Sequence, residues 1–196
     1  MLGESRVESK SNEIKAIPKL LKMLDIKDAI ITIDAMGTQK GIANLTRIKQ
    51  GDYVLALKKN HKLFYRHVNR IFMRADKLSY DNMVFNHLEE QDYGHGRMEY
   101  RRYTVLPSMY LHQYKKNWRD LSAVIRVESR RYKNGEEQTS IKYDITSLPF
   151  SQFKRACYAI RQHWSIENNL HWKLDVGLNE DRCLASRGHA AENLST

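Results

Sequence analysis

One short segment, residues 29–57, constrains the fold of this chain more than any other. Residues 29–35 (AIITIDA) are a β-branched apolar run, and residues 53–57 (YVLAL) are a second one. Such short, mainly apolar runs are typical of strands buried on both faces. Residues 38–50 between them carry apolar side chains at helical spacing and stop at a glycine. Strand, helix and strand in this order predict a βαβ unit with parallel strands, and hence an α/β fold.

The periodicity of the chain changes near residue 83. Residues 83–106 alternate like strands, and residues 122–147 resemble a hairpin that turns at Asn134-Gly135. Helical spacing returns from Ser151 onward in one long segment. The predicted organisation is one core made of residues 1–82 and 148–196, with a β-rich insertion at residues 83–147.

Composition limits the class of protein. The chain has 196 residues, of which 41% are hydrophobic and 29% charged, as expected of a folded globular protein. It contains no apolar run of about 18 residues that could cross a membrane and no secretory signal at its start. Two cysteines make no disulfide framework. We therefore expect a cytoplasmic protein without a membrane partner.

Positive charge is concentrated in residues 40–74. The whole chain has a formal net charge of +10, and this segment holds nine lysines and arginines against a single acid, Asp52. A surface of this kind suits the phosphate backbone of a nucleic acid. The alternative is a solvated basic face that only keeps the protein soluble.

Asp34 ends the first predicted strand. Ligands of open α/β sheets bind at the carboxyl ends of the parallel strands, so this carboxylate is a candidate for catalysis. The alternative is that Asp34 only caps the turn at residues 35–37, as aspartates often do after strands.

Glu167 lies in the middle of an apolar helix stripe. At 100° per residue, Ile160, Trp164 and His171 project in nearly the same direction as this glutamate. A carboxylate at such a position must be paired, protonated or bound to a cation, because leaving it dry and unpaired costs several kcal/mol. If the helix packs on the sheet, Glu167 points toward Asp34, and two carboxylates suit Mg²⁺ or Mn²⁺.

Two other interpretations of this helix remain open. Glu167 could be a structural residue that bonds to His163, His171 or an arginine. His163, Glu167 and His171 also recur at intervals of four, which could hold Zn²⁺, although neither histidine belongs to an H-E-x-x-H pattern.

Arginines and tyrosines are interleaved around residue 100. The residues concerned are Tyr93, Arg97, Tyr100, Arg101, Arg102 and Tyr103. Charge mixed with flat rings suits phosphate contact and base stacking. The alternative is a solvated strand face with a tyrosine core; we favour DNA contact for the arginines and the core for the tyrosines.

Several motifs occur in order along almost the whole chain. They are KSNEI (10–14) with AIP (16–18), TIDAMG (32–37), GDYVLALK (51–58), HGR (95–97), SLP (147–149), HWSIEN (163–168), LHW (170–172), LDV (174–176) and NED (179–181). On these motifs the chain resembles the insertion-sequence transposases of the H-repeat-associated type, members of the DDE superfamily with an RNase H-like catalytic fold. The set is far more specific than any single motif.

The resemblance implies roles for individual residues. Asp34 corresponds to the second carboxylate of the family's catalytic triad, and Glu167 to the last one. It implies two Mg²⁺ (or Mn²⁺) ions, the ends of a DNA element and its target as partners, and Mg²⁺-dependent DNA cleavage and strand transfer as the activity; homo-oligomerisation is compatible with it. We expect DNA contacts from Lys58, Lys59, Arg97, Arg101 and His163.

The first aspartate of the triad has no counterpart in the motifs that match. We therefore expect an incomplete RNase H-like core, truncated at both ends, that is inactive alone. The alternatives are a non-catalytic DNA-binding or partner-binding remnant, and a decayed reading frame.

Overall fold

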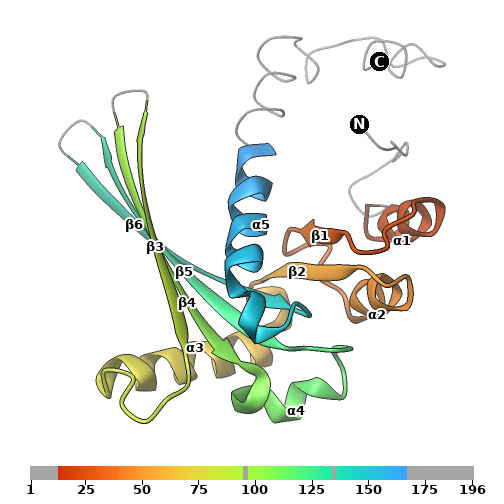
Figure 1. The fold of residues 1–196 in the computed structure, drawn as a ribbon, viewed down its shortest axis with the longest axis horizontal. Coiled ribbons are helices and arrows are strands. Elements are labelled where there is room, and N and C mark those ends of the chain that lie inside the picture. The colour runs from red at the N-terminus through yellow and green to blue at the C-terminus, as the bar shows by residue number, and fades with distance from the viewer. Residues whose placement is uncertain (1–12, 95–96, 134–135, 167–196) are drawn as a thin grey trace. The chain divides into compact units, whose positions relative to one another are not determined.

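The computed structural model describes residues 13–94, 97–133 and 136–166 (Figure 1). The α-helices and strands in these ranges are α1 (Glu13–Met23), β1 (Ile30–Ile33), α2 (Lys40–Ile48), β2 (Asp52–Leu57), α3 (Lys62–Lys77), β3 (Asn86–Gly94), β4 (Arg97–Pro107), α4 (His112–Lys115), β5 (Ala123–Lys133), β6 (Glu136–Thr146) and α5 (Phe153–Ile166). The chain divides into two compact units, Met1–Ala159 and Ile160–Thr196, so α5 begins in the first unit and ends in the second. None of the described helices is both long and apolar enough to cross a membrane.

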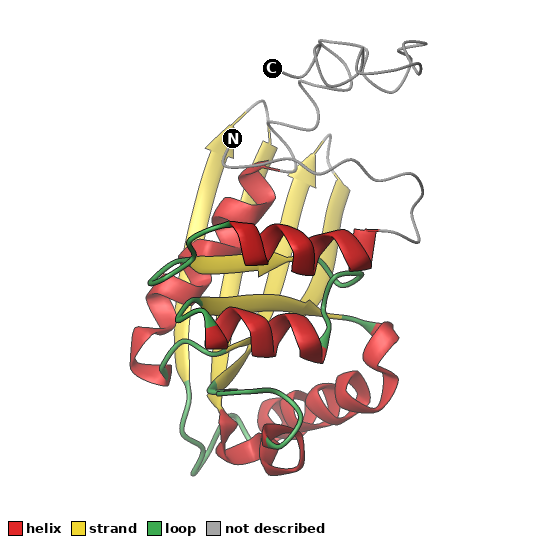
Figure 2. Cartoon of the chain, turned by 90° about the vertical axis from the view of Figure 1, so that its right-hand side faces the viewer, coloured by secondary structure: helices red, strands yellow, loops and turns green. Residues whose placement is uncertain are grey.

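The six strands form one mixed sheet in the order β1-β2-β6-β5-β4-β3. β1 and β2 are parallel, and every other neighbouring pair is antiparallel. In Figure 2 the two parallel strands cross the direction of the four hairpin strands at a steep angle. The predicted βαβ unit and the predicted β-rich strands after residue 83 are both confirmed at the level of secondary structure.

The junction between β2 and β6 joins these two parts into one sheet. Val54 pairs with Thr146 and Leu57 with Tyr143. Side-chain hydrogen bonds reinforce the pairing, because the Tyr53 backbone N–H donates to Ser147 Oγ (2.9 Å) and Thr146 Oγ1 donates to the Tyr53 carbonyl (2.8 Å). The β-rich segment therefore shares a hydrogen-bonded sheet with the βαβ unit.

Helix α3 and the segment after β4 cover one face of this sheet. Phe64, Val68 and Phe72 recur every four residues along α3 and are buried in the main core cluster. This cluster also contains Trp118 and residues of β2 and β6, among them Tyr143, whose ring lies 5.5 Å from that of Phe72. The apolar stripe of α3 thus explains its position.

The opposite face of the sheet is buried as well. Val105 and Ile125, which are paired across β4 and β5, are at most 1% exposed. Ala156 and Cys157 in the first turns of α5 are equally buried, and Cys157 lies within electrostatic range of Tyr103 on β4 and Asp144 on β6. β2 and the neighbouring ends of the hairpin strands are therefore covered on both sides.

The prediction that both parallel strands are buried on both faces is wrong for one of them. All four residues of β1 are only half-buried, whereas four of the six residues of β2 are buried. The difference arises because β1 is an edge strand of the described sheet, whereas β2 lies between β1 and β6.

A buried arginine connects α3 to β5. The Arg126 side chain is 6% exposed, and its guanidinium donates to both carboxylate oxygens of Asp76 (2.7 and 2.9 Å) and to the Tyr80 hydroxyl (2.9 Å). It also lies 4.9 Å from the centre of the Phe72 ring. Desolvating a guanidinium is costly, so its partners must remain in place.

We predict that Asp76→Asn destabilises the protein by about 2 kcal/mol, because it weakens the pairing of a charge that stays buried. Glu89→Gln is the matched control, since Glu89 meets Arg102 at 3.3 Å with both side chains about half exposed; it should cost well under about 1 kcal/mol. Urea unfolding followed by circular dichroism measures both values. Equal losses in the two variants would contradict the role assigned to Arg126.

Candidate functional site

Asp34 lies directly after β1, at the carboxyl end of the parallel pair. Its Oδ1 atom accepts hydrogen bonds from the backbone N–H groups of Met36 (3.1 Å) and Gly37 (3.3 Å), so the side chain does cap the turn. The residue is nevertheless exposed, and no described residue donates a hydrogen bond to its Oδ2 atom. The capping role and a role as a cation ligand are therefore compatible, since a carboxylate has about four acceptor sites.

Three side chains hold the loop that follows Asp34. The Thr38 hydroxyl lies 2.9 Å from the Asp34 carbonyl and 2.7 Å from the Ala56 carbonyl, which links the ends of β1 and β2. Asn60 Nδ2 donates to the Ala35 carbonyl (2.5 Å), and His61 Nε2 lies 2.6 Å from the Thr38 carbonyl. Contacts from both sides thus fix the backbone around Asp34.

Gly37 allows this loop to pack against α1. A Cβ atom at this position would lie 2.3 Å from Ile33 Cγ2 and 2.8 Å from Ile17 Cδ1, closer than real carbon contacts allow. The glycine in the TIDAMG motif therefore has a steric cause.

Lys58 and Lys59 follow β2 at the same edge of the sheet as Asp34. Both lysines are exposed. Parallel strands present their carboxyl ends on one side, so the carboxylate and the two ammonium groups lie along one edge. This edge combines a potential cation ligand with groups that can bind phosphate.

Asp144 is a buried carboxylate that sequence reasoning missed. It lies on β6 opposite Ala56, and Asp34 follows Ile33, which pairs with Leu55; the two aspartates thus stand at one level of the sheet on either side of Ala56. Burial raises the pKa of Asp144 to about 7, although the charges of Lys142 and Lys58 partly oppose this.

Residues 141–146 explain why Asp144 was missed. Hydrophobic and polar residues alternate there, and Asp144 falls on the polar side with Lys142 and Thr146, which is typical of a solvated face. Asp144 is buried instead by segments that are distant in the sequence, and a local hydrophobic pattern does not reveal such contacts.

The basic segment at residues 40–74 divides into structural and exposed groups. Arg47 binds Asp52 (2.6 Å) and Asp120 (2.9 Å), and Lys49 donates to backbone carbonyls at the end of α1. The basic residues of α3 up to residue 74 follow one another every four residues, are exposed, and meet no carboxylate within ion-pair distance in the described part of the chain: Lys62, Arg66, Arg70 and Arg74. We call these four the α3 basic stripe.

Arg101 does not lie on an open surface. Its side chain is 7% exposed, and its Nη2 atom lies 2.6 Å from Glu99 Oε2, while Arg131 binds the other oxygen of Glu99 at 2.9 Å. Contact with a phosphate would require Arg101 to leave this pair. Arg97 is the first residue of β4 and pairs with Gly94 of β3.

The other predicted site residues belong to the second compact unit. His163 is a partly buried residue of α5. Glu167 and His171 lie outside the described residues, so both the carboxylate pair and the zinc alternative stay predictions. Within the described ranges, no three histidine, cysteine, aspartate or glutamate side chains form a cluster that could hold a metal ion.

Comparison with known proteins identifies similar chains. A family model described as "Transposase DDE domain" matches residues 5–195. "Putative transposase YncI" of Escherichia coli O157:H7 and "H repeat-associated putative transposase YhhI" of Escherichia coli K12 are each 38% identical to this chain over its whole length. An uncharacterised protein of Xanthobacter autotrophicus is 37% identical over 75% of the chain.

The chain matches only part of the length of each relative. The chain spans 50% of YncI, 52% of YhhI and 48% of the Xanthobacter protein, or about half of each. No solved structure matches the chain.

We predict that Asp144→Asn stabilises the protein at high pH. Below about pH 4 the carboxyl is protonated in the folded and unfolded states alike, so the variant and the parent should be equally stable. Between about pH 4 and the folded pKa of about 7, only the unfolded chain releases the proton, and the parent loses up to about 4 kcal/mol relative to the variant. Urea unfolding at several pH values measures this, with exposed Asp81→Asn as the control. Parallel pH profiles for parent and Asp144→Asn would contradict the burial of a titrating group.

Proposed function

The chain belongs to the family of transposases with a DDE domain, and we propose that it contributes two carboxylates of a divalent-metal site that cuts and joins DNA. The observation that carries this proposal is Asp34, an exposed carboxylate on a fixed loop at the carboxyl end of the parallel strands. Such an edge is where open α/β sheets bind their ligands.

In this proposal Asp34 and Glu167 are metal ligands. The family generally uses divalent metal ions, and the Oδ2 atom of Asp34 fits a hard cation such as Mg²⁺ or Mn²⁺ because it accepts no hydrogen bond from the described residues. When bound, two such ions would activate water or a 3′-hydroxyl and polarise the scissile phosphate. His163, one helical turn before Glu167 in sequence, would orient that carboxylate or contact DNA.

We further propose that residues 1–82 and 148–196 form an RNase H-like core and that residues 83–147 are an insertion in it. The parallel βαβ unit made of β1, α2 and β2 supports the first part. The insertion is supported by its four consecutive antiparallel strands, which lie between the βαβ unit and α5 in the chain.

Lys58 and Lys59 are the phosphate ligands that the structure supports best. They are exposed and lie on the same sheet edge as Asp34. The α3 basic stripe begins three residues after Lys59 in the chain and adds four exposed positive charges. Arg97 stays in the proposal on sequence grounds, whereas Arg101 would first have to leave Glu99.

We predict that Asp34→Asn weakens Mn²⁺ binding by at least about tenfold, because it removes a charged ligand. Duplex DNA binding should be unchanged or slightly tighter. Isothermal titration with Mn²⁺ and fluorescence anisotropy with a labelled duplex measure the two affinities. Asp120→Asn, an exposed carboxylate near the other end of the sheet, is the control. Unchanged Mn²⁺ affinity in Asp34→Asn would refute its role as a ligand.

The double variant Lys58→Ala/Lys59→Ala should weaken duplex binding and lower the slope of log K against log salt by about 1 to 2, because each contact releases a counterion. Lys15→Ala/Lys19→Ala on α1 removes the same charge elsewhere and should leave that slope nearly unchanged. Equal effects of the two double variants would show that only net charge matters.

A polypeptide limited to these 196 residues should not cleave element-end DNA with Mg²⁺, since it supplies two of the three triad carboxylates that the family resemblance implies. A strand-cleavage assay on labelled DNA tests this. Cleavage that disappears in Asp34→Asn would show that another residue completes the site.

A further inference from the structure

The alternation of side chains along β4 separates two sets of residues that are mixed in the sequence. Glu99, Arg101 and Tyr103 are buried on one face of the strand. Met98, Tyr100 and Arg102 point to the other face, where Met98 is 37% exposed and the Arg102 side chain 50% exposed. We predicted that the tyrosines belong to the core. On β4 this prediction is confirmed for Tyr103 but not for Tyr100.

The strand register extends this open face onto β5. Tyr132 lies opposite Met98, Arg130 opposite Tyr100, and Glu128 opposite Arg102. We call these six residues the tyrosine–arginine face. Each strand contributes one ring and one guanidinium group to this face, and the ring of one strand lies opposite the guanidinium of the other at the pair Tyr100 and Arg130.

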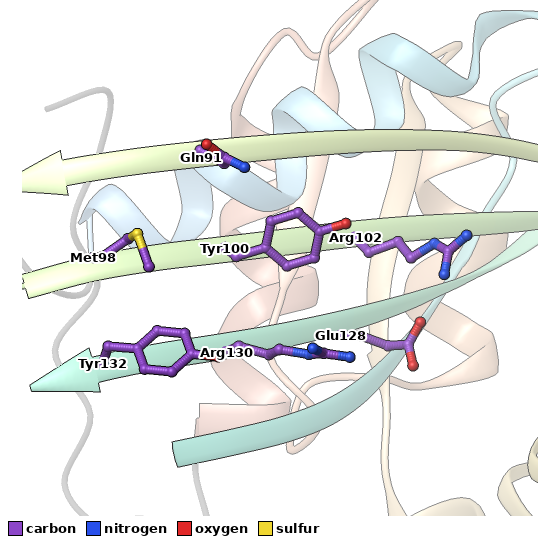
Figure 3. Close-up of a pocket in the computed structure, with 7 residues that line it drawn as sticks. All are labelled: Gln91, Met98, Tyr100, Arg102, Glu128, Arg130 and Tyr132. Carbon is purple, nitrogen blue, oxygen red and sulfur yellow. The ribbon is translucent and has the colours of Figure 1, made fainter. Parts of the chain in front are cut away.

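Figure 3 shows how these side chains lie. Tyr100 and Tyr132 come from neighbouring strands, and the flat faces of both rings are turned toward the viewer. The guanidinium groups of Arg102 and Arg130 extend along the strands beside them. Together with Gln91 on β3 the six residues line an open hollow of about 300 Å³. Tyr132 is 37% exposed and Tyr100 is half-buried, so the ring faces that border this hollow can stack on planar groups.

The charges of the face are unequally engaged. Glu128 lies 3.2 Å from the buried Arg126, which holds it in the protein. Arg102 pairs with Glu89 at 3.3 Å, and both side chains are about half exposed; such a pair contributes little. Arg130 is exposed and has no carboxylate within ion-pair distance among the residues that the structure describes. The face therefore offers cations to an anionic ligand in a chain whose net charge is +10.

We propose that the tyrosine–arginine face binds unpaired nucleotides of a DNA strand. Bases would stack on Tyr100 and Tyr132, while Arg130 and Arg102 would contact the phosphates between them. Bases can stack on these rings only if they are not paired inside a duplex. The positive groups beside the rings are placed to contact the phosphates of the same strand. This inference rests on the proposed function for its choice of DNA, and it concerns a surface separate from Asp34.

Two other occupants fit the face less well. A duplex keeps its bases stacked inside the helix, so they cannot lie on the rings of Tyr100 and Tyr132. A second copy of the chain would bury Arg102, Arg130 and Glu128 at the centre of an interface, where charged residues are depleted.

The test uses the 196-residue chain and a fluorescein-labelled oligothymidylate of about 12 nucleotides, with fluorescence anisotropy as the readout. Tyr100→Leu and Tyr132→Leu keep an apolar side chain but lose the ring, and each should weaken binding roughly 5- to 100-fold. Tyr100→Phe and Tyr132→Phe keep the ring and should bind like the parent. Arg130→Gln should lower the salt slope by about 0.7.

Tyr158→Leu is the matched control, because Tyr158 is a 63% exposed tyrosine on α5. Thermal melting of every variant checks that it is folded. A blunt duplex of the same length should bind the leucine variants and the parent equally, and should instead respond to Lys58→Ala/Lys59→Ala.

Oligothymidylate binding that is unchanged in both leucine variants would overturn the inference. So would a change in sedimentation of those variants without a change in DNA affinity, which would identify a contact between copies of the chain. If duplex binding and Mn²⁺ binding persist while oligothymidylate does not bind, this inference fails and the proposed function stands. If Mn²⁺ binding is independent of Asp34 while the tyrosines still control oligothymidylate binding, the proposed metal site fails and the inference stands.

Discussion

The pairing of β2 with β6 is the interaction on which the rest of the first compact unit depends. It connects a parallel βαβ unit to four antiparallel strands, and the side chains of Thr146 and Ser147 hydrogen-bond the backbone of Tyr53 at the point of contact. Because of this pairing β2 is an inner strand with both faces covered. The strand ends that precede Asp34, Lys58 and Lys59 thus belong to a six-stranded sheet in which β2 is hydrogen-bonded on both sides.

The fixed position of the Asp34 carboxylate favours metal binding. A metal ligand is effective when its carboxylate is held in place before the cation binds, and the turn at Met36 and Gly37 holds Asp34 in that way. The same packing buries the carboxylate of Asp144 away from water, and this burial raises its pKa to about 7. One tertiary arrangement therefore positions one acid and perturbs another.

Sequence reasoning succeeded where a local pattern determines the structure. The apolar runs around residues 30 and 55 and the alternation after residue 83 predicted strands that the structure confirms, and the ordered motifs identified the family that the comparisons show. It failed where burial depends on distant segments, as at β1, Asp144 and Arg101. Strand period 2 assigns Arg101 and Arg102 to opposite faces but does not say which face is covered. That information comes from the strand register and from the segments that pack against each face of the sheet.

The separation along the chain of the two strands at the junction affects how the protein folds. Tyr53 and Ser147 lie 94 residues apart, whereas β3 with β4 and β5 with β6 are joined by short connections. Closing a long loop costs more chain entropy than closing a short hairpin, and contacts of high sequence separation slow folding. The hairpins can therefore form early and independently, while the carboxyl edge with Asp34 acquires its final support only after the long-range pairing. We therefore expect the candidate site to be among the last parts of the first unit to become ordered.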